Sequence, residues 1–164
     1  MEVAKEARKE FPSVMMHILG LVRMGYVSSP EKGQYVITQK GKEALGFPEI
    51  NKEKATAILA YVPYDKAFHF YAGVGKPLNL HAHSLREFAE SIEKASLESI
   101  QFHMDRGDFE AWFNGLGDQE LAKKIALFKQ KNVVGDDLRK QLREIVEQRY
   151  VALAKLAGQP VYTE

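Results

Sequence analysis

The sequence has no cysteine, no excess of either charge and no long hydrophobic run, and each absence excludes a class of protein. Without cysteine there is no disulfide, no thiolate nucleophile and no zinc site built on sulfur ligands. The 23 lysine and arginine residues nearly cancel the 22 aspartate and glutamate residues, so neither an overall basic field nor an acidic field favours a charged partner. Any electrostatic recognition must therefore be local.

The sequence also has no pattern typical of a membrane-spanning segment or of a signal peptide, so we expect neither. Charged residues interrupt the apolar stretches well before the roughly 20 residues that cross a bilayer, and no basic stretch followed by an apolar one opens the chain. With 45% hydrophobic and 27% charged residues among 164, the composition is that of a globular protein. We expect a cytoplasmic protein of one domain or two small ones, without a membrane partner.

The first 47 residues alternate between helical and strand patterns. Apolar residues at helical spacing predict helices, and two short β-branched and aromatic runs around a polar turn predict a hairpin. A glycine follows the longest helical pattern and is a natural stop. The expected elements are, in order, a helix in residues 2–10, a helix from Pro12 to Met24 ahead of Gly25, strands at 26–27 and 35–38, and a short helix after Thr38.

The segments MGYV at 24–27 and YVITQKGKEAL at 35–45 resemble the winged-helix repressors of the MarR, ArsR and PadR type, over residues 11–46. The resemblance implies a helix that lies in the major groove of DNA and a wing that contacts phosphate. The first helix of that fold is missing, so we expect it to be encoded upstream or replaced by a partner. The residues implied to contact DNA are Ser13, Met16, His17 and Arg23 on the helix and Lys32 and Gln34 on the wing.

The same helix also carries an apolar face. Related repressors usually have polar or basic residues at the positions of Met15, Met16, Leu19 and Gly20, and residues 1–47 hold only seven basic residues against five acidic ones. An exposed apolar face made by Met15, Met16 and Leu19 is typical of an interface with a partner or a second copy. A protein-interaction or oligomerisation module is therefore the alternative to a DNA-associated transcriptional regulator.

The rest of the chain predicts a linker and a second domain. Residues 48–66 form the expected linker, with a short helix capped by Asn51, and alternation on both sides of Gly73–Pro77 predicts a β-hairpin. Helices follow, and the last opens at Gly135 and ends at Gly158, with an apolar stripe long enough to pair with another copy. The predicted helix caps are Ser84, in a capping box with Glu87, then Ser96, Asp108 and Asp118.

Residues 66–153 are similar to an uncharacterised prokaryotic domain family of unknown function. The resemblance is carried by SLREFAESI at 84–92, SLESIQFHMDRGDFEAWF at 96–113 and LGDQELAKKI at 116–125, and it implies a fold boundary but no chemistry. The expected fold is α+β, mostly α: a partial winged helix-turn-helix over residues 1–47, a linker over 48–66, and a small β-hairpin with a helical bundle and a long C-terminal helix over 67–164. We expect this second domain to dimerise the chain or to sense a small molecule whose chemistry the sequence leaves open.

Three histidines of the second domain are candidates for a metal site. His81 and His83 lie two residues apart on one strand face, and His69 lies on the opposing strand, a spacing compatible with zinc, nickel or iron. Without a fixed further ligand, such a pattern is more often surface or packing. A His-based metal-binding protein is therefore a further alternative, and we predict no cofactor.

The densest polar cluster is formed by His103, Asp105, Arg106, Asp108 and Trp112. A histidine with two acids can supply a general base and a residue that orients it. No nucleophile or oxyanion loop accompanies the cluster, and Asp108 is expected to cap a helix and to form a salt bridge with Arg106. We therefore predict no catalytic residue and no enzymatic activity.

Overall fold

The computed structural model describes residues 10–161, so the helix expected in residues 2–10 lies, apart from Glu10, outside the described residues. The chain divides into two compact units, the first ending at Glu49 and the second starting at Ile50. Within residues 10–161, no helix is both long enough and apolar enough to cross a membrane. Each unit is described by itself below.

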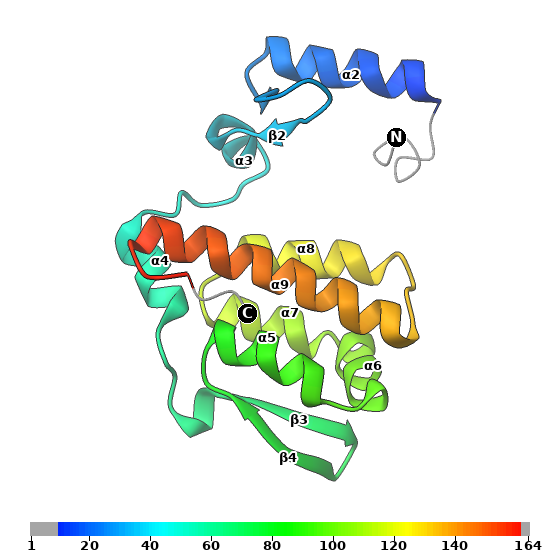
Figure 1. The fold of residues 1–164 in the computed structure, drawn as a ribbon, viewed down its shortest axis with the longest axis vertical. Coiled ribbons are helices and arrows are strands. Elements are labelled where there is room, and N and C mark those ends of the chain that lie inside the picture. Colours follow the sequence, from blue (N-terminus) through cyan, green and yellow to red (C-terminus); the bar gives the residue numbers. More distant parts are fainter. Residues whose placement is uncertain (1–9, 162–164) are drawn as a thin grey trace. The chain divides into compact units, whose positions relative to one another are not determined.

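The first unit consists of a helix, a two-stranded hairpin and a short helix (Figure 1). α2 (Phe11–Arg23) has proline in its first turn, and the chain reverses after it at Gly25, whose φ is 77°. β1 (Val27–Ser28) pairs antiparallel with β2 (Val36–Ile37), and α3 (Gln39–Ala44) follows. The order and type of these elements are those predicted from the sequence, with the first strand shifted by one residue and the second shorter than expected.

Thr38 and Gly41 join α3 to the turn that follows α2. The Thr38 hydroxyl accepts a hydrogen bond from the Gly41 amide at 3.1 Å, which caps α3, and donates one to the Gly25 carbonyl oxygen at 2.6 Å. Gly41 is buried, and a Cβ at this position would collide with the carbonyl oxygen of Tyr26. The Thr-x-x-Gly segment therefore closes the hairpin onto the end of α2.

The core of the first unit is small. Val14 and Ile18 on α2 are buried, and the half-buried Met15, Val22 and Tyr35 pack against them. Within residues 10–49 no other apolar side chain is buried apart from these two on α2. The large apolar side chains that remain exposed in this unit are Phe11, Met16, Leu19, Leu21, Met24, Val36, Ile37 and Leu45.

The second unit is a helical domain with one β-hairpin beside it (Figure 1). It begins with α4 (Lys52–Leu59), which Asn51 caps as predicted and which packs against the last helix of the chain. Ala55 and Ile58 of α4 are buried in the core of this unit. The segment 48–66 was expected to be a linker, but its helix is part of the folded domain. The further helices are α5 (Leu85–Lys94), α6 (Leu97–Arg106), α7 (Asp108–Gly115), α8 (Gln119–Lys129) and α9 (Gly135–Ala157).

The predicted β-hairpin is present and has an irregular register. A single turn of 3-10 helix, η1 (Tyr64–Lys66), leads into β3 (Phe68–Gly73), which pairs antiparallel with β4 (Lys76–Ala82). His69 lies opposite His81 and Tyr71 lies opposite Pro77, so β4 has more residues than β3 between the two pairs. Asn79 adopts a positive φ of 52° within this bulge.

α9 is the central helix of the second unit. It contacts α4, α5, α6 and α8, and its buried residues include Leu138, Leu142, Val146 and Leu153. The predicted start at Gly135 and the stop at Gly158 are confirmed. The apolar stripe that we expected to reach another copy is largely used inside this chain, and α+β, mostly α, with a hairpin and a long C-terminal helix, is confirmed as the fold class.

Of the four helix caps predicted after the β3–β4 hairpin, three are confirmed. The side chains of Ser84, Ser96 and Asp118 accept hydrogen bonds from the amides of α5, α6 and α8. Asp108 does not cap α7, because Gly107 occupies the capping position with a φ of 77° and Asp108 is already the first helical residue. In the predicted capping box, the Glu87 carboxylate should accept a hydrogen bond from the amide of Ser84. It accepts one from the amide of His83 instead, one residue earlier in the chain.

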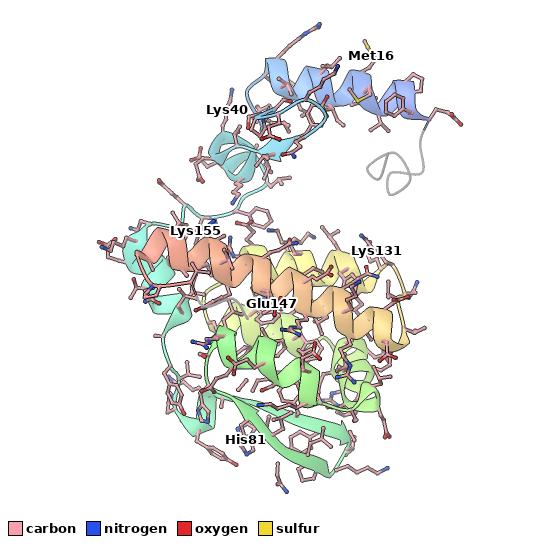
Figure 2. All side chains as sticks on the ribbon, viewed as in Figure 1. Met16, Lys40, His81, Lys131, Glu147 and Lys155 are labelled. Atoms are coloured by element: carbon pink, nitrogen blue, oxygen red, sulfur yellow. The ribbon has the colours of Figure 1, made fainter. Side chains whose placement is uncertain are left out.

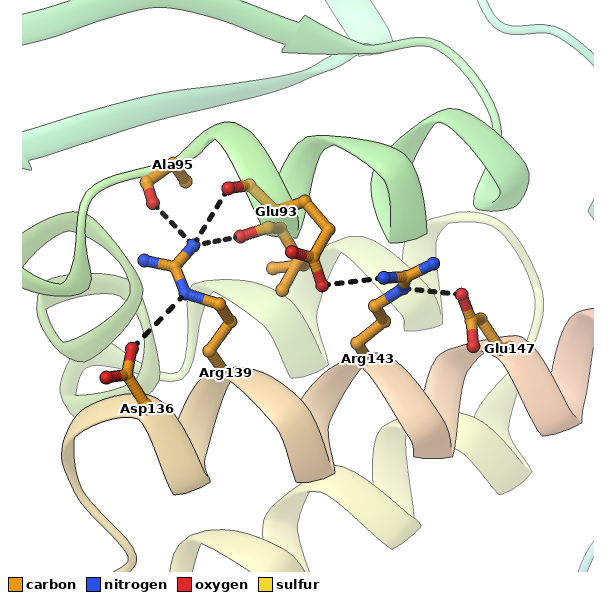
Figure 3. A network of polar contacts seen from close by, with 7 residues as sticks. Glu93, Ala95, Asp136, Arg139, Arg143 and Glu147 are labelled. Carbon is orange, nitrogen blue, oxygen red and sulfur yellow. Dashed lines mark hydrogen bonds and ion pairs between the residues drawn. The ribbon is translucent and has the colours of Figure 1, made fainter. Parts of the chain in front are cut away.

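Two arginines of α9 hold the end of α5 (Figure 3). Arg139 donates from Nη1 to the carbonyl oxygens of Ile92, Glu93 and Ala95, which have no partner inside the helix. Arg143 binds the Glu93 carboxylate at 2.7 Å and the Glu147 carboxylate at 2.6 Å. The charges of α9 thus fix the position of α5, on which the hairpin rests.

Candidate functional site

The six residues predicted to contact DNA are all exposed in the first unit. On α2 they lie on the exposed side of the helix, away from the buried Val14 and Ile18, because spacings of three, four and seven residues follow the helical turn. Gly20 lies on the same face, and outside its own helical turn nothing lies within 4 Å of where a Cβ would be, so another molecule can approach the backbone closely there. The exposed set is Ser13, Met16, His17 and Arg23 on α2, with Lys32 and Gln34 between β1 and β2.

The three residues predicted to form an apolar interface separate into two groups. Met15 is half-buried and packs against Val14 and Ile18, so it belongs to the small core. Met16 is 69% exposed and Leu19 is 41% exposed. Figure 2 shows Met16 projecting from α2 on the side away from β2 and α3. The exposed apolar face therefore consists of Met16 and Leu19, without Met15.

The charge of the first unit is balanced. Residues 10–49 contain four basic and four acidic side chains. Lys40 donates a hydrogen bond to the Met24 carbonyl oxygen at 2.8 Å and lies over the Tyr26 ring, 4.8 Å from its centroid. His17 donates from Nδ1 to the Ser13 carbonyl oxygen at 2.7 Å. The side chains of Arg23 and Lys32, the other two exposed basic residues of this unit, have no hydrogen bond or ion pair with residues 10–161.

In the second unit, His69 and His81 meet across the hairpin and bond to each other. The Nδ1 atoms of the two rings lie 2.8 Å apart, and Nε2 of His69 donates to the Tyr64 carbonyl oxygen at 2.8 Å. Because His69 carries its proton on Nε2, its Nδ1 accepts a hydrogen bond from the Nδ1–H of His81. Burial, together with the neighbouring rings of His69 and His83, lowers the pKa of His81.

His83 is turned toward the segment ahead of the hairpin. Its Nδ1 donates to the Val62 carbonyl oxygen at 3.0 Å, and its ring stacks on Tyr61 with centroids 4.6 Å apart. Across residues 10–161, no three His, Cys, Asp or Glu side chains are placed to hold a metal ion. The three histidines predicted as metal candidates are near one another, but both nitrogens of His69 are used within the protein. Nε2 of His69 and Nδ1 of His83 bond the carbonyl oxygens of Tyr64 and Val62 and so fix this segment to the hairpin.

His103 on α6 is buried between β3 and α7. Its Nδ1 donates to the Asp108 carboxylate at 2.7 Å, and its Nε2 accepts the backbone N–H of Tyr71 at 2.8 Å. Burial lowers the pKa of His103 although Asp108 acts in the opposite direction, so the ring is held neutral. A general base needs a free lone pair within reach of its substrate, and both nitrogens of His103 are occupied.

The remaining members of the polar cluster have separate roles. The predicted salt bridge between Arg106 and Asp108 is confirmed, with 3.1 Å between Nε and Oδ2, and the guanidinium lies over the Phe102 ring at 5.1 Å from its centroid. Asp105 accepts a hydrogen bond from Gln101, and Trp112 donates one to the Lys66 carbonyl oxygen. The cluster is therefore a buried histidine with an exposed ion pair rather than a set of convergent catalytic groups.

A pocket of about 350 Å³ opens beside this ion pair. The sequence analysis singled out the histidines and the charged residues of its wall but missed the other hairpin residues and Phe102, because they come together only when β3 folds onto α6. The lining residues are Phe68, His69, Tyr71, Gly73, Val74, Gly75, Phe102, His103, Arg106 and Asp108.

Residues 49–147, more than half of the chain, match a family described as a family of unknown function (DUF5752). The matched range includes α4, the hairpin and the helices up to the middle of α9. Comparison with curated proteins and with solved structures gave no significant match. The chain thus belongs to the DUF5752 family of unknown function.

Proposed function

We propose that this chain is a DNA-associated transcriptional regulator, in which α2 lies in the major groove and the turn between β1 and β2 contacts the backbone. The observation that carries the proposal is that all six residues singled out by the resemblance to winged-helix repressors are exposed, four of them on one face of α2. The helix, hairpin and short helix have the order of that resemblance. The helical domain would then dimerise the chain or respond to a ligand.

The side chains on α2 suit a specific division of roles. Ser13 and His17 have polar groups that can bond base edges, and Met16 can contact the methyl group of thymine. Gly20 leaves room for the groove wall. Arg23 and Lys32 are the exposed cations that would bind phosphate.

Two phosphate contacts predict a weak dependence of binding on salt. Each contact contributes a slope of about −0.9 in a plot of log affinity against log salt concentration, so a slope of about −2 is expected for one chain. Fluorescence anisotropy of labelled genomic fragments, repeated across salt concentrations, measures this slope. Binding without a negative slope contradicts the proposal.

Substitution of Arg23 and Lys32 tests whether these two side chains bind phosphate. An Arg23→Gln, Lys32→Gln double variant is expected to bind more weakly and to lose most of the slope. Lys94→Gln combined with Lys155→Gln removes two exposed lysines of the second unit and is the matched control. Equal weakening by the two double variants would mean that overall charge, rather than α2 and the hairpin, determines binding.

A second candidate function is self-association through the exposed apolar face of α2. It is favoured by the exposure of Met16 (69%) and Leu19 (41%) and by the balanced charge of residues 10–49, which gives two copies no net repulsion. Sedimentation of the wild type and of a Met16→Glu variant tests it. An oligomer that is unchanged by Met16→Glu excludes this face as the interface.

A further inference from the structure

The pocket beside Arg106 is built by a continuous chain of hydrogen bonds. The backbone N–H of Tyr71 donates to Nε2 of His103, whose Nδ1 donates to Oδ2 of Asp108 at 2.7 Å. Arg106 donates from Nε to the same Oδ2 at 3.1 Å. His103 is 4% exposed, so the chain connects the hairpin through a buried ring to the pair of charges at the pocket.

The irregular register of the hairpin supplies the first link of this chain. Pro77 lies opposite Tyr71, and the bulge around Asn79 breaks the regular ladder between them. The Tyr71 amide can therefore turn to His103 instead of completing a strand pair. This arrangement fixes the imidazole tautomer and with it the orientation of the Asp108 carboxylate.

Both charged groups keep unused bonding capacity. The two hydrogen bonds to Asp108 end on Oδ2, and within residues 10–161 neither Oδ1 of Asp108 nor the Nη atoms of Arg106 have a hydrogen-bond partner. The Arg106 side chain is 54% exposed and that of Asp108 is 30% exposed, so solvent reaches both. The pocket thus offers a negative acceptor and a positive donor side by side.

The remaining walls are mostly apolar. Phe102 lies under the Arg106 guanidinium, Phe68 contributes its ring from β3, and Val74 at the hairpin turn is 84% exposed. The volume of about 350 Å³ is at the lower end for small-molecule pockets, which hold roughly 300–1,000 Å³. The ligand must therefore be small and in part apolar.

We propose that this pocket binds a zwitterion of the α-amino-acid class. The ligand carboxylate bonds the Nη atoms of Arg106, the ligand ammonium bonds Oδ1 of Asp108, and an apolar side chain lies against Phe102 and Val74. A simple anion meets repulsion from Asp108 and a simple cation meets repulsion from Arg106, whereas a zwitterion complements both. The site lies wholly in the second unit and does not depend on whether the first unit binds DNA.

Calorimetric titration of the full chain with L-phenylalanine, 3-phenylpropionate and 2-phenylethylamine tests the two charges separately. The second compound lacks the ammonium group and the third lacks the carboxylate. We expect L-phenylalanine to bind and each analogue to bind at least tenfold more weakly, because each loses a charge-assisted hydrogen bond. Absence of saturable binding by both L-phenylalanine and L-leucine overturns the proposal, and so does phenylpropionate binding as tightly as phenylalanine.

Arg106→Gln is expected to weaken L-phenylalanine binding at least tenfold. Its matched control is Arg86→Gln, which removes an arginine of α5 that pairs with Glu90 outside the pocket wall and should leave affinity unchanged. Val74→Glu alters only an exposed turn residue, and it should weaken binding by placing a charge on the apolar wall. Thermal unfolding by circular dichroism verifies that each variant is folded, and wild-type affinity in both Arg106→Gln and Val74→Glu overturns the assignment of the site.

Discussion

Arg149 and Asp118 form a two-point ion pair inside the second unit, with Nε and Nη2 of the arginine each 2.8 Å from a different carboxylate oxygen. Both residues are buried, and Glu120 binds the third arginine nitrogen at 3.0 Å. Burial opposes the charge of Arg149, but the hydrogen bonds and charges of Asp118 and Glu120 outweigh it and raise the pKa of the arginine. Because Asp118 also caps α8 through the amide of Leu121, one carboxylate joins the start of α8 to α9.

Removing this arginine is expected to destabilise the second unit strongly. Arg149→Met leaves Asp118 buried without its counter-charge, and breaking a buried ion pair in this way typically costs about 3–5 kcal/mol. Urea denaturation followed by far-UV circular dichroism measures the loss, since the signal is dominated by the helices of this unit.

The control for this variant is another arginine of the same helix. Arg143 forms ion pairs with Glu93 and Glu147, but all three side chains are partly exposed. Arg143→Met is therefore expected to cost only about 0–1 kcal/mol, the range of surface ion pairs. Similar losses for the two variants would mean that the Arg149 pair contributes little beyond its exposed counterpart.

Helix boundaries of this chain are predictable because their causes are local. Ser84, Ser96 and Asp118 bond amides only three residues away, so their roles are readable from the sequence. Asp108 satisfied the same local rule, but α7 begins one residue earlier than expected, so Asp108 is its first helical residue and its carboxylate bonds His103 and Arg106 instead. The sequence indicated that Asp108, His103 and Arg106 are neighbours, but it did not indicate whether Asp108 would bond a helix amide or these two side chains.

The pocket was not predictable, since its parts come from separate elements. Tyr71 and His103 are far apart in the sequence, and their hydrogen bond depends on a bulge whose register is set by tertiary packing. α4 is a related case: its eight residues have too short an apolar pattern to show which surface covers Ala55 and Ile58. Their burial against α9 is decided by contacts distant in the sequence.

A single added methyl group, at Gly41, is expected to destabilise the fold of the first unit. Gly41→Ala places a Cβ against the carbonyl oxygen of Tyr26 and the side chain of Ile37, so the hairpin must shift to accommodate it. The small core around Val14 and Ile18 offers little to compensate. Hydrogen exchange of the amides in residues 26–44 should become much faster, while protection of the second unit stays unchanged.

Gly20→Ala is the matched change at an open helical position. Its Cβ meets nothing within 4 Å outside its own helical turn, so the substitution should stabilise α2 by about 0.5–1 kcal/mol through the helix propensity of alanine. The outcome for Gly41→Ala decides the prediction. If its amides in residues 26–44 exchange as slowly as those of the wild type, the close approach of α3 to Tyr26 is not needed for the fold of this unit.

His103 gives the second unit a stability that depends on pH. Its folded pKa lies below the ordinary value of 6.5 because the ring is buried, so the unfolded chain takes up the proton first as the pH falls. The stabilisation by neutral His103 is full above the ordinary pKa and is lost as the pH falls below it. We therefore expect the free energy of unfolding to decrease between about pH 8 and about pH 5.

A variant that cannot titrate separates His103 from the other groups. His103→Gln retains a donor and an acceptor but takes up no proton, so its unfolding free energy should fall less than that of the wild type over the same range. Part of the decrease should remain, because the pKa of His81 is lowered as well. His17→Gln, at an exposed position in the first unit, should follow the wild type. Urea denaturation at each pH measures these unfolding free energies. If the wild type and His103→Gln lose the same free energy over this range, His103 is not a source of the pH dependence. Its ring is then not held neutral between Tyr71 and Asp108.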